Sequence, residues 1–308
     1  MKKLIINAFV AAVAIIASAS VCNAQVRQYT HDMVAFTSID ASADFEVSVQ
    51  QGISYQVVLT IDEPYKDYVT CSVNNQVLTI GVDDKKVPKE VKALYKGKTS
   101  VQPTFKAMVY LPADYRIRAI NLSDKAVYYD YMEGPIAGDV VVNVTDNAMV
   151  KALTVSAPAV TVNADKRANV TLTSNCDEVS IKMNGNAIAN ITEHLASKTG
   201  VALSNAANLT CFLDTDALNF EAKATAKAAL NGRADKAVYD CAASSVTNAS
   251  NLVNKEAKVT MSSLCNLTVA ASDFLKVENL NGGATLNFSG SPVIEVGSIT
   301  KSTMTSVK

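Results

Sequence analysis

The residues best suited to bind a ligand form one short run, Tyr128-Tyr129-Asp130-Tyr131. Successive side chains of a strand point to opposite faces, so Tyr129 and Tyr131 share one face and Tyr128 lies on the other. A tyrosine ring combines a large apolar face with a polar hydroxyl, which suits stacking against a sugar. We therefore expect Tyr129 and Tyr131, with Asp130 beside them, to form a ligand-binding platform. The alternative is that these tyrosines only pack two regions of the chain together.

Groups that could perform catalysis are sparse. His31 and His194 are the two histidines of the chain, and no G-x-S-x-G motif presents a serine to either. We expect His31 in a frayed N-terminus and His194 in a solvated loop. Glycoside hydrolysis needs two carboxyl groups facing one sugar, and Asp214 and Asp216 are the pair best spaced for it. Arginine, a base that a polysaccharide lyase would use, is scarce. We expect no enzymatic activity, no catalytic residues and no cofactor.

Cysteine spacing argues against a metal site. The last five cysteines contain no C-x-x-C pair, which zinc sites usually use, and the glycine-rich calcium repeat of other solenoids is absent. Cys211 and Cys265 alternate with apolar residues, so we expect them to point into a core. Disulfide pairing is the alternative, and an odd number in an exported chain would leave at least one thiol free. These five residues are Cys71, Cys176, Cys211, Cys241 and Cys265.

The N-terminus has the pattern of a secretory signal peptide. Two lysines precede an apolar run from Leu4 to Val21, and small residues follow it. We expect residues 1–24 to be removed by cleavage after Ala24, which places the mature chain outside the cytoplasm, at the cell surface or in the periplasm. Two alternatives are a retained membrane anchor and lipidation at Cys22. The 28 Lys and Arg residues nearly balance 29 Asp and Glu residues, so the chain lacks the basic surface of a nucleic-acid binder.

Residues 25–116 predict a small β region that caps the rest of the chain. Apolar residues alternate with polar ones in several short segments between 45 and 82, with turn residues such as Gln51-Gly52 and Asn74-Asn75 between them. This pattern predicts a meander of antiparallel strands. Pro88 near the start and Gly97 at the end predict a short helix over 87–97. A further strand over 105–111 ends at Pro112.

Residues 117–308 contain a motif that recurs with a period of about 20 residues, which is typical of solenoids. Asn–apolar–Ser/Thr triplets start at Asn121, Asn143, Asn169, Asn190, Asn208, Asn248, Asn266 and Asn287. A turn-forming residue precedes a small one in step with them, ending at Ala126, Ala148, Ala168 and Ala187. Such units bury their inner face only by stacking, which predicts an all-β, right-handed parallel β-helix-like solenoid in which the asparagines form a ladder. A β-sandwich is the alternative. We expect the polar residues 297–308 to blunt the far end.

Several segments together resemble the auto-transporter adhesin head (GIN) domain family of exported bacterial proteins. They are Phe36-Thr37-Ser38-Ile39-Asp40, the run from Phe45 to Gly52, Leu78-Thr79-Ile80 and Val109-Tyr110-Leu111-Pro112. The resemblance covers about residues 36–296 and implies an entry strand pair followed by a β-helix-like body. Many members carry Ser-Gly at the rung corners, whereas this chain uses Asp or Asn before Ala. The resemblance implies adhesion or recognition and brings no catalytic residues.

The combined expectation is an exported, non-enzymatic solenoid that acts in cell-surface adhesion or recognition. A glycan, a matrix component or another extracellular or envelope protein is the expected partner, and the open ends of a solenoid favour self-association. The first alternative is a periplasmic structural protein that binds another envelope component. The second is a polysaccharide-active enzyme.

Overall fold

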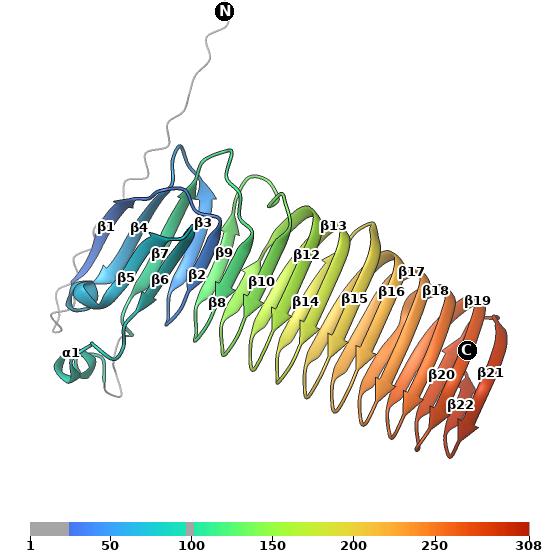
Figure 1. Ribbon diagram of the computed structural model, residues 1–308. Coiled ribbons are helices and arrows are strands. Elements are labelled where there is room, and N and C mark those ends of the chain that lie inside the picture. Colours follow the sequence, from blue (N-terminus) through green and yellow to red (C-terminus); the bar gives the residue numbers. More distant parts are fainter. Residues whose placement is uncertain (1–24, 97–101, 308) are drawn as a thin grey trace, which may run out of the picture.

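The computed structural model describes residues 25–96 and 102–307. Its strands stack along one axis from a cap at the N-terminal end to the last strands of the chain (Figure 1). The expected signal peptide, with Cys22 and the cleavage position at Ala24, lies outside the described residues. None of the described helices is long and apolar enough to cross a membrane.

Each turn of the solenoid, called a rung here, has two strand segments joined by a tight corner. Segments before the corner form face 1, and segments after it form face 2. Face 1 begins with β2 (Ser38–Ala41), β8 (Ala119–Leu122) and β10 (Val140–Val144) and later includes β15 (Ala196–Leu203) and β21 (Val293–Thr300). Face 2 includes β3 (Glu46–Gln51), β9 (Val127–Tyr131), β11 (Met149–Ala152), β14 (Ile188–Glu193), β20 (Thr285–Ser289) and β22 (Thr303–Ser306).

The longer strands bend around the side of the rung opposite the corner and so belong to both faces. They are β12 (Thr154–Ala164), β13 (Asn169–Met183), β16 (Asn208–Ala222), β17 (Lys227–Ala242), β18 (Val246–Ser262) and β19 (Asn266–Asn281). Every pairing between rungs is parallel, for example β16 with β17 from Asn208↔Lys227 to Ala222↔Cys241. Chain segments one repeat apart therefore pair, and the predicted solenoid is confirmed.

The corner explains the period. A residue at the same place in each corner takes a positive φ. From Asp124 onward these residues lie 19 to 22 apart: Asp124, Asp146, Lys166, Gly185, Asn205, Ala224, Ala243, Ser263, Gly282 and Lys301. Within a corner, the Ala148 N–H donates to the Thr145 carbonyl at 3.1 Å. Between rungs, the Asn147 N–H donates to the Asp124 carbonyl at 2.7 Å. The repeated turn is thus hydrogen-bonded both within itself and to its neighbours, although few of its residues are glycine.

The small residues that follow the corner face the core. Ala126, Ala148, Ala168 and Ala187 are fully buried, as the sequence predicted from their spacing, and Ala207, Ala226, Cys265 and Ala284 continue the same column. A side chain larger than these would collide with the opposite face because the corner brings the two faces close together. Farther from the corner, the core between the two faces holds larger side chains. One such column consists of Val162, Ile181, Val201, Phe220, Tyr239, Val259 and Val277.

An asparagine ladder is present, but of the predicted triplets it includes only Asn121 and Asn143. The Asn121 side-chain amide donates to Asp40 at 2.6 Å, that of Asn143 to Asn121 at 2.7 Å, and that of Asn163 to Asn143 at 2.8 Å. These residues lie on strands rather than at turns. The other triplets occupy two different columns, one with Asn169, Asn208 and Asn266 and one with Asn190, Asn248 and Asn287. A single ladder through all the triplets is therefore wrong.

The N-terminal cap combines a strand that precedes the first rung with an insertion between the first rung and the second. Its parts are β1 (Val26–Asp32), β4 (Gln56–Asp62), the 3₁₀ helix Glu63–Tyr68, β5 (Val69–Asn74), β6 (Val77–Val82), α1 (Lys89–Ala93) and β7 (Phe105–Leu111). The pairs β1–β4, β4–β7 and β5–β6 are antiparallel, as predicted for a cap. A consecutive meander is wrong, however, because β2 and β3 pair parallel with β8 and β9 and so form the first rung. The predicted helix is present as α1 and is shorter than expected.

The last described rung differs from the expected polar tail. Residues 293–306 continue the parallel stack as β21 and β22, which pair with β19 and β20. Ile294, Val296 and Ile299 lie in register with the buried residues Leu275, Val277 and Leu280, yet they are 42 to 46% exposed. This segment is therefore a solenoid rung with an uncovered inner side, and it does not blunt the end.

Candidate functional site

The two tyrosines predicted to form a platform lie together on the outer side of face 2. The rings of Tyr129 and Tyr131 on β9 are parallel, with an interplanar angle of 2° and centroids 6.0 Å apart. Tyr131 is 59% exposed, whereas Tyr128 is fully buried. The alternation predicted for these three residues is confirmed. Tyr128 is a residue of the core.

Neighbouring strands extend the surface around the stacked pair. Tyr129 lies in register with Ser48 of β3, and Tyr131 with Gln50. Gln50 is in turn in register with Tyr110 of β7, which places a third tyrosine two strands away from Tyr131. These strands belong to the first rungs and the cap, so the platform rests on a continuous hydrogen-bonded sheet and its rings need little ordering on binding.

Asp130 does not lie beside the two stacked rings. It is in register with the inward residue Val49, and its Oδ1 accepts a hydrogen bond from the Met132 N–H at 3.2 Å. Burial raises the pKa of the Asp130 carboxyl. Burial first, and the Asp130 charge second, also raises the pKa of Tyr128. The structure therefore places Asp130 on the inner side of β9, next to Tyr128, and the predicted position beside the platform is corrected.

The residues considered for catalysis do not converge. His31 is exposed on β1, which is a paired strand rather than a frayed end, and His194 is exposed with its ring 6.5 Å from that of Phe212. The Asp214 carboxylate accepts a hydrogen bond from the Arg233 guanidinium at 2.7 Å, and Asp216 is exposed. The Asp214 carboxylate, which would have to face a sugar, is therefore bound to the Arg233 guanidinium.

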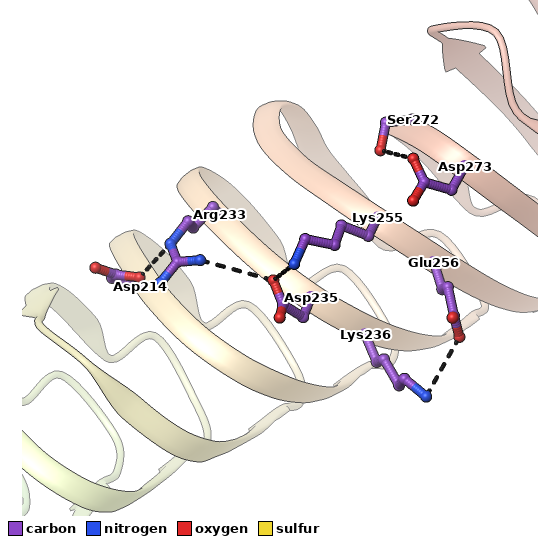
Figure 2. A network of polar contacts seen from close by, with 8 residues as sticks. All are labelled: Asp214, Arg233, Asp235, Lys236, Lys255, Glu256, Ser272 and Asp273. Atoms are coloured by element: carbon purple, nitrogen blue, oxygen red, sulfur yellow. Dashed lines mark hydrogen bonds and ion pairs between the residues drawn. The ribbon is translucent and has the colours of Figure 1, made fainter.

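Asp214 is the first member of an ion-pair chain that links successive rungs (Figure 2). Arg233 also lies 3.7 Å from Asp235, which pairs with Lys255 of the next rung at 2.9 Å. Exposed pairs of this kind contribute little to stability individually. Their alternating signs favour one register of the stack over shifted ones. The network was not predicted, because its members come from different repeats and no local pattern joins them.

A buried carboxyl group was also missed. Glu193 is fully buried, and its Oε2 accepts a hydrogen bond from the Thr199 hydroxyl at 2.7 Å. Its Oε1 has no hydrogen-bond partner among the described residues. Burial, and to a lesser degree the charge of Asp214, raises the pKa of Glu193 to about 7. Only the alternation of Ile191 and Glu193 could have indicated the inward position.

The described cysteines are free thiols. Cys211 and Cys265 are fully buried, as predicted, and all five described cysteines are unpaired. Burial raises the pKa of Cys241 to about 12, which makes this thiol unreactive at neutral pH. Within the described part of the chain, no three His, Cys, Asp or Glu residues are grouped as metal ligands.

Three solved structures with similar folds come from Parabacteroides species. A "putative adhesin" from Parabacteroides merdae is 16% identical, with a TM-score of 0.52 over 93% of this chain and 98% of that one. A "putative adhesin" from Parabacteroides distasonis is 16% identical, with a TM-score of 0.51 over 92% and 98%. A "putative lipid binding protein" from the same species is 15% identical, with a TM-score of 0.50 over 93% and 98%. At these identities the likeness shows the fold alone.

No curated protein matches the chain. A family model does match, over residues 35–212 and 193–292, which together include nearly the whole solenoid and most of the cap. The matched range agrees with the segments that carried the resemblance in the sequence. The chain belongs to the family described as "Putative auto-transporter adhesin, head GIN domain".

Proposed function

We propose that this adhesin-like protein is exported and recognises a glycan or matrix component at the cell surface through Tyr129 and Tyr131, without enzymatic activity. The observation that carries the proposal is the parallel pair of tyrosine rings, one of them largely exposed, on a rigid sheet. Exposed tyrosine rings offer apolar faces with hydroxyl groups at their edges. The family description supports adhesion in general terms.

The test compares the Tyr129→Ala/Tyr131→Ala double variant with the unchanged protein on glycan arrays and on immobilised matrix proteins. We expect ligand binding to fall at least about tenfold, because each ring contributes on the order of 1 kcal/mol of contact. Phe212→Ala, which removes another exposed aromatic ring, is the matched control and should bind normally. Unchanged binding of the double variant, or a large fall in its melting temperature, would contradict the proposed site.

The location is tested separately by protease treatment of intact cells. Loss of the protein while a periplasmic marker survives supports surface exposure. Protection until lysis would favour the second candidate, a periplasmic envelope protein. The uncovered inner side of β21 is the observation that favours assembly with another envelope component or a second copy. A polysaccharide-active enzyme has less support because Asp214 is paired with Arg233.

A further inference from the structure

A long groove runs along face 1 beside the corners and is separate from the tyrosine platform on face 2. Its volume is about 880 Å³, and its lining reaches from Thr79 on β6, the parallel neighbour of β2, to Glu221 on β16. It crosses eight successive strands, which at the roughly 4.8 Å spacing of neighbouring strands corresponds to about 34 Å. A ligand that fills such a groove must be elongated and lie along the axis of the solenoid.

Two columns of polar side chains form the walls of the groove. One wall is the ladder of Asn121, Asn143 and Asn163. Each of its two internal amide hydrogen bonds uses one N–H and one carbonyl lone pair. An amide has two N–H donors and two lone pairs, so every member keeps at least one donor and one acceptor for a ligand. The ladder therefore repeats the same hydrogen-bonding groups at each rung.

The second wall lies two residues further along each strand. It carries Ser123, Thr145, Asp165 and Asn184, in which the Asn184 amide donates to Asp165 at 2.9 Å. The residues between the two columns, such as Val144, point into the core and are almost fully buried. The exposed lining includes more apolar than polar surface, so the polar groups of the two walls must supply the specificity for a ligand. A ligand with hydroxyl groups along both edges would meet partners on both walls.

Charge narrows the class of ligand further. The acidic groups of Asp40, Asp165 and Glu221 are unfavourable to a polyanion. The ammonium groups of Lys182 and Lys223 are unfavourable to a polycation. The central rungs present mainly amides and hydroxyls. We propose that this groove binds a linear neutral polysaccharide, one hydroxylated sugar unit after another along successive rungs. The proposed groove site rests on the proposed function of glycan recognition and names the class of glycan. The groove and the tyrosine platform share no residue, so the two sites can be tested separately.

The experiment uses titration calorimetry of the mature chain with neutral linear oligosaccharides of the cellulose, xylan, starch and chitin types, from disaccharides to octasaccharides. We expect affinity to rise with length until the groove is filled. Thr145→Arg, which fills the groove without removing a ladder residue, should abolish binding. Asn143→Ala should weaken it about tenfold, as expected for the loss of one to two hydrogen bonds. Asn190→Ala, an exposed asparagine on face 2, is the matched control and should bind normally.

The outcomes separate the two sites. Loss of binding in Thr145→Arg but not in Tyr129→Ala/Tyr131→Ala supports the groove. The reverse pattern overturns the groove and leaves the platform in place. Absence of binding by every oligosaccharide at millimolar concentration also overturns it, as does saturable binding of a fatty acid or an extended peptide that Thr145→Arg blocks. Should a variant fail to fold, side-chain amide shifts of the three ladder asparagines in NMR spectra of the unchanged protein decide the matter, because only a ligand in the groove moves all three.

Discussion

The interior rungs and the last described rung place similar residues in the same columns, yet bury them differently. Val162, on an interior rung, and Val296, on β21, both belong to the column that runs through Val277. Val162 is fully buried and Val296 is 46% exposed. The side chains are identical and both strands are parallel pairs, so the difference comes from the neighbouring rung that covers Val162. A column position in a solenoid therefore determines direction, while burial depends on the next rung.

The two ends of the rod extend this comparison. At the N-terminal end, cap strands pair with the first rung, and Phe45 packs against Phe105 of β7 with centroids 5.3 Å apart. Both phenylalanines are buried. At the other end, β21 and β22 have no strand on their outer side among the described residues. Solenoid stability is roughly a sum of rung and interface terms, so the last rung contributes one interface instead of two.

The largest expected effect comes from placing a charge in this column. Val162→Lys buries an unpaired ammonium group between rungs and should lower the free energy of unfolding by at least about 4 kcal/mol. Val296→Lys leaves its ammonium group in water and should change it by less than about 1 kcal/mol. Urea unfolding followed by circular dichroism measures both. Equal losses in the two variants would mean that the last rung is covered in solution, for example by a second copy.

How much of this could be predicted depends on which residues carry the period. The alanines at 126, 148, 168 and 187 follow the corner at a constant distance, so their spacing indicated both the rung length and their inward direction. The asparagine triplets do not keep a constant distance from the corner. Asn169 and Asn190 therefore fell into different columns although their separation is close to one period. The rungs vary in length by two residues or more. A spacing of about 20 residues between two asparagines therefore cannot show whether they lie in the same column or in columns two residues apart.

The candidate sites were predicted to a different extent. Local alternation was sufficient to place Tyr129 and Tyr131 on one face and Tyr128 on the other. The same alternation puts Asp130 on the face of Tyr128. The expectation that Asp130 lies beside Tyr129 and Tyr131 did not take this into account. The groove on face 1 was not foreseen because it is formed by residues from eight different strands, and no local segment contains more than three of its positions. The cap insertion after β3 was missed because the parallel partner of β3, β9, lies beyond the whole insertion in the sequence.

The second prediction concerns Glu193, whose position also depends on burial by adjacent rungs. Its pKa in the folded state is about 7, above the usual 4.5, so the folded protein holds a proton that the unfolded chain releases between these values. Stability from this group is therefore fully present below pH 4.5 and is lost as the pH rises to about 7. Glu193→Gln cannot ionise, and it should be more stable than the unchanged protein at pH 8 by up to about 3 kcal/mol.

Urea unfolding at pH 5 and pH 8 measures this difference, which should be small at pH 5. Glu178→Gln changes an exposed glutamate one rung away and is the matched control. We expect its stability difference from the unchanged protein to be the same at both pH values. A pH-independent effect of Glu193→Gln would show that packing of the new amide, rather than loss of the ionisable group, determines the change.

The smallest expected effect lies at the corners. Ala224, on an interior rung, and Lys301, on the last rung, both have a positive φ, of 59° and 51°. This conformation costs a residue with a Cβ about 1 kcal/mol, and glycine avoids the cost but gains freedom in the unfolded chain. Ala224→Gly should therefore raise the free energy of unfolding by roughly 0.5 kcal/mol.

Lys301→Gly should leave the free energy of unfolding unchanged, because a rung with one neighbour opens before the rest of the molecule unfolds and its corner is already released. Urea unfolding of the two variants, with hydrogen exchange at β17 and β22, measures global and local opening separately. A gain of equal size in both would place the last rung in the same cooperative unit as the interior, which again requires something to cover β21.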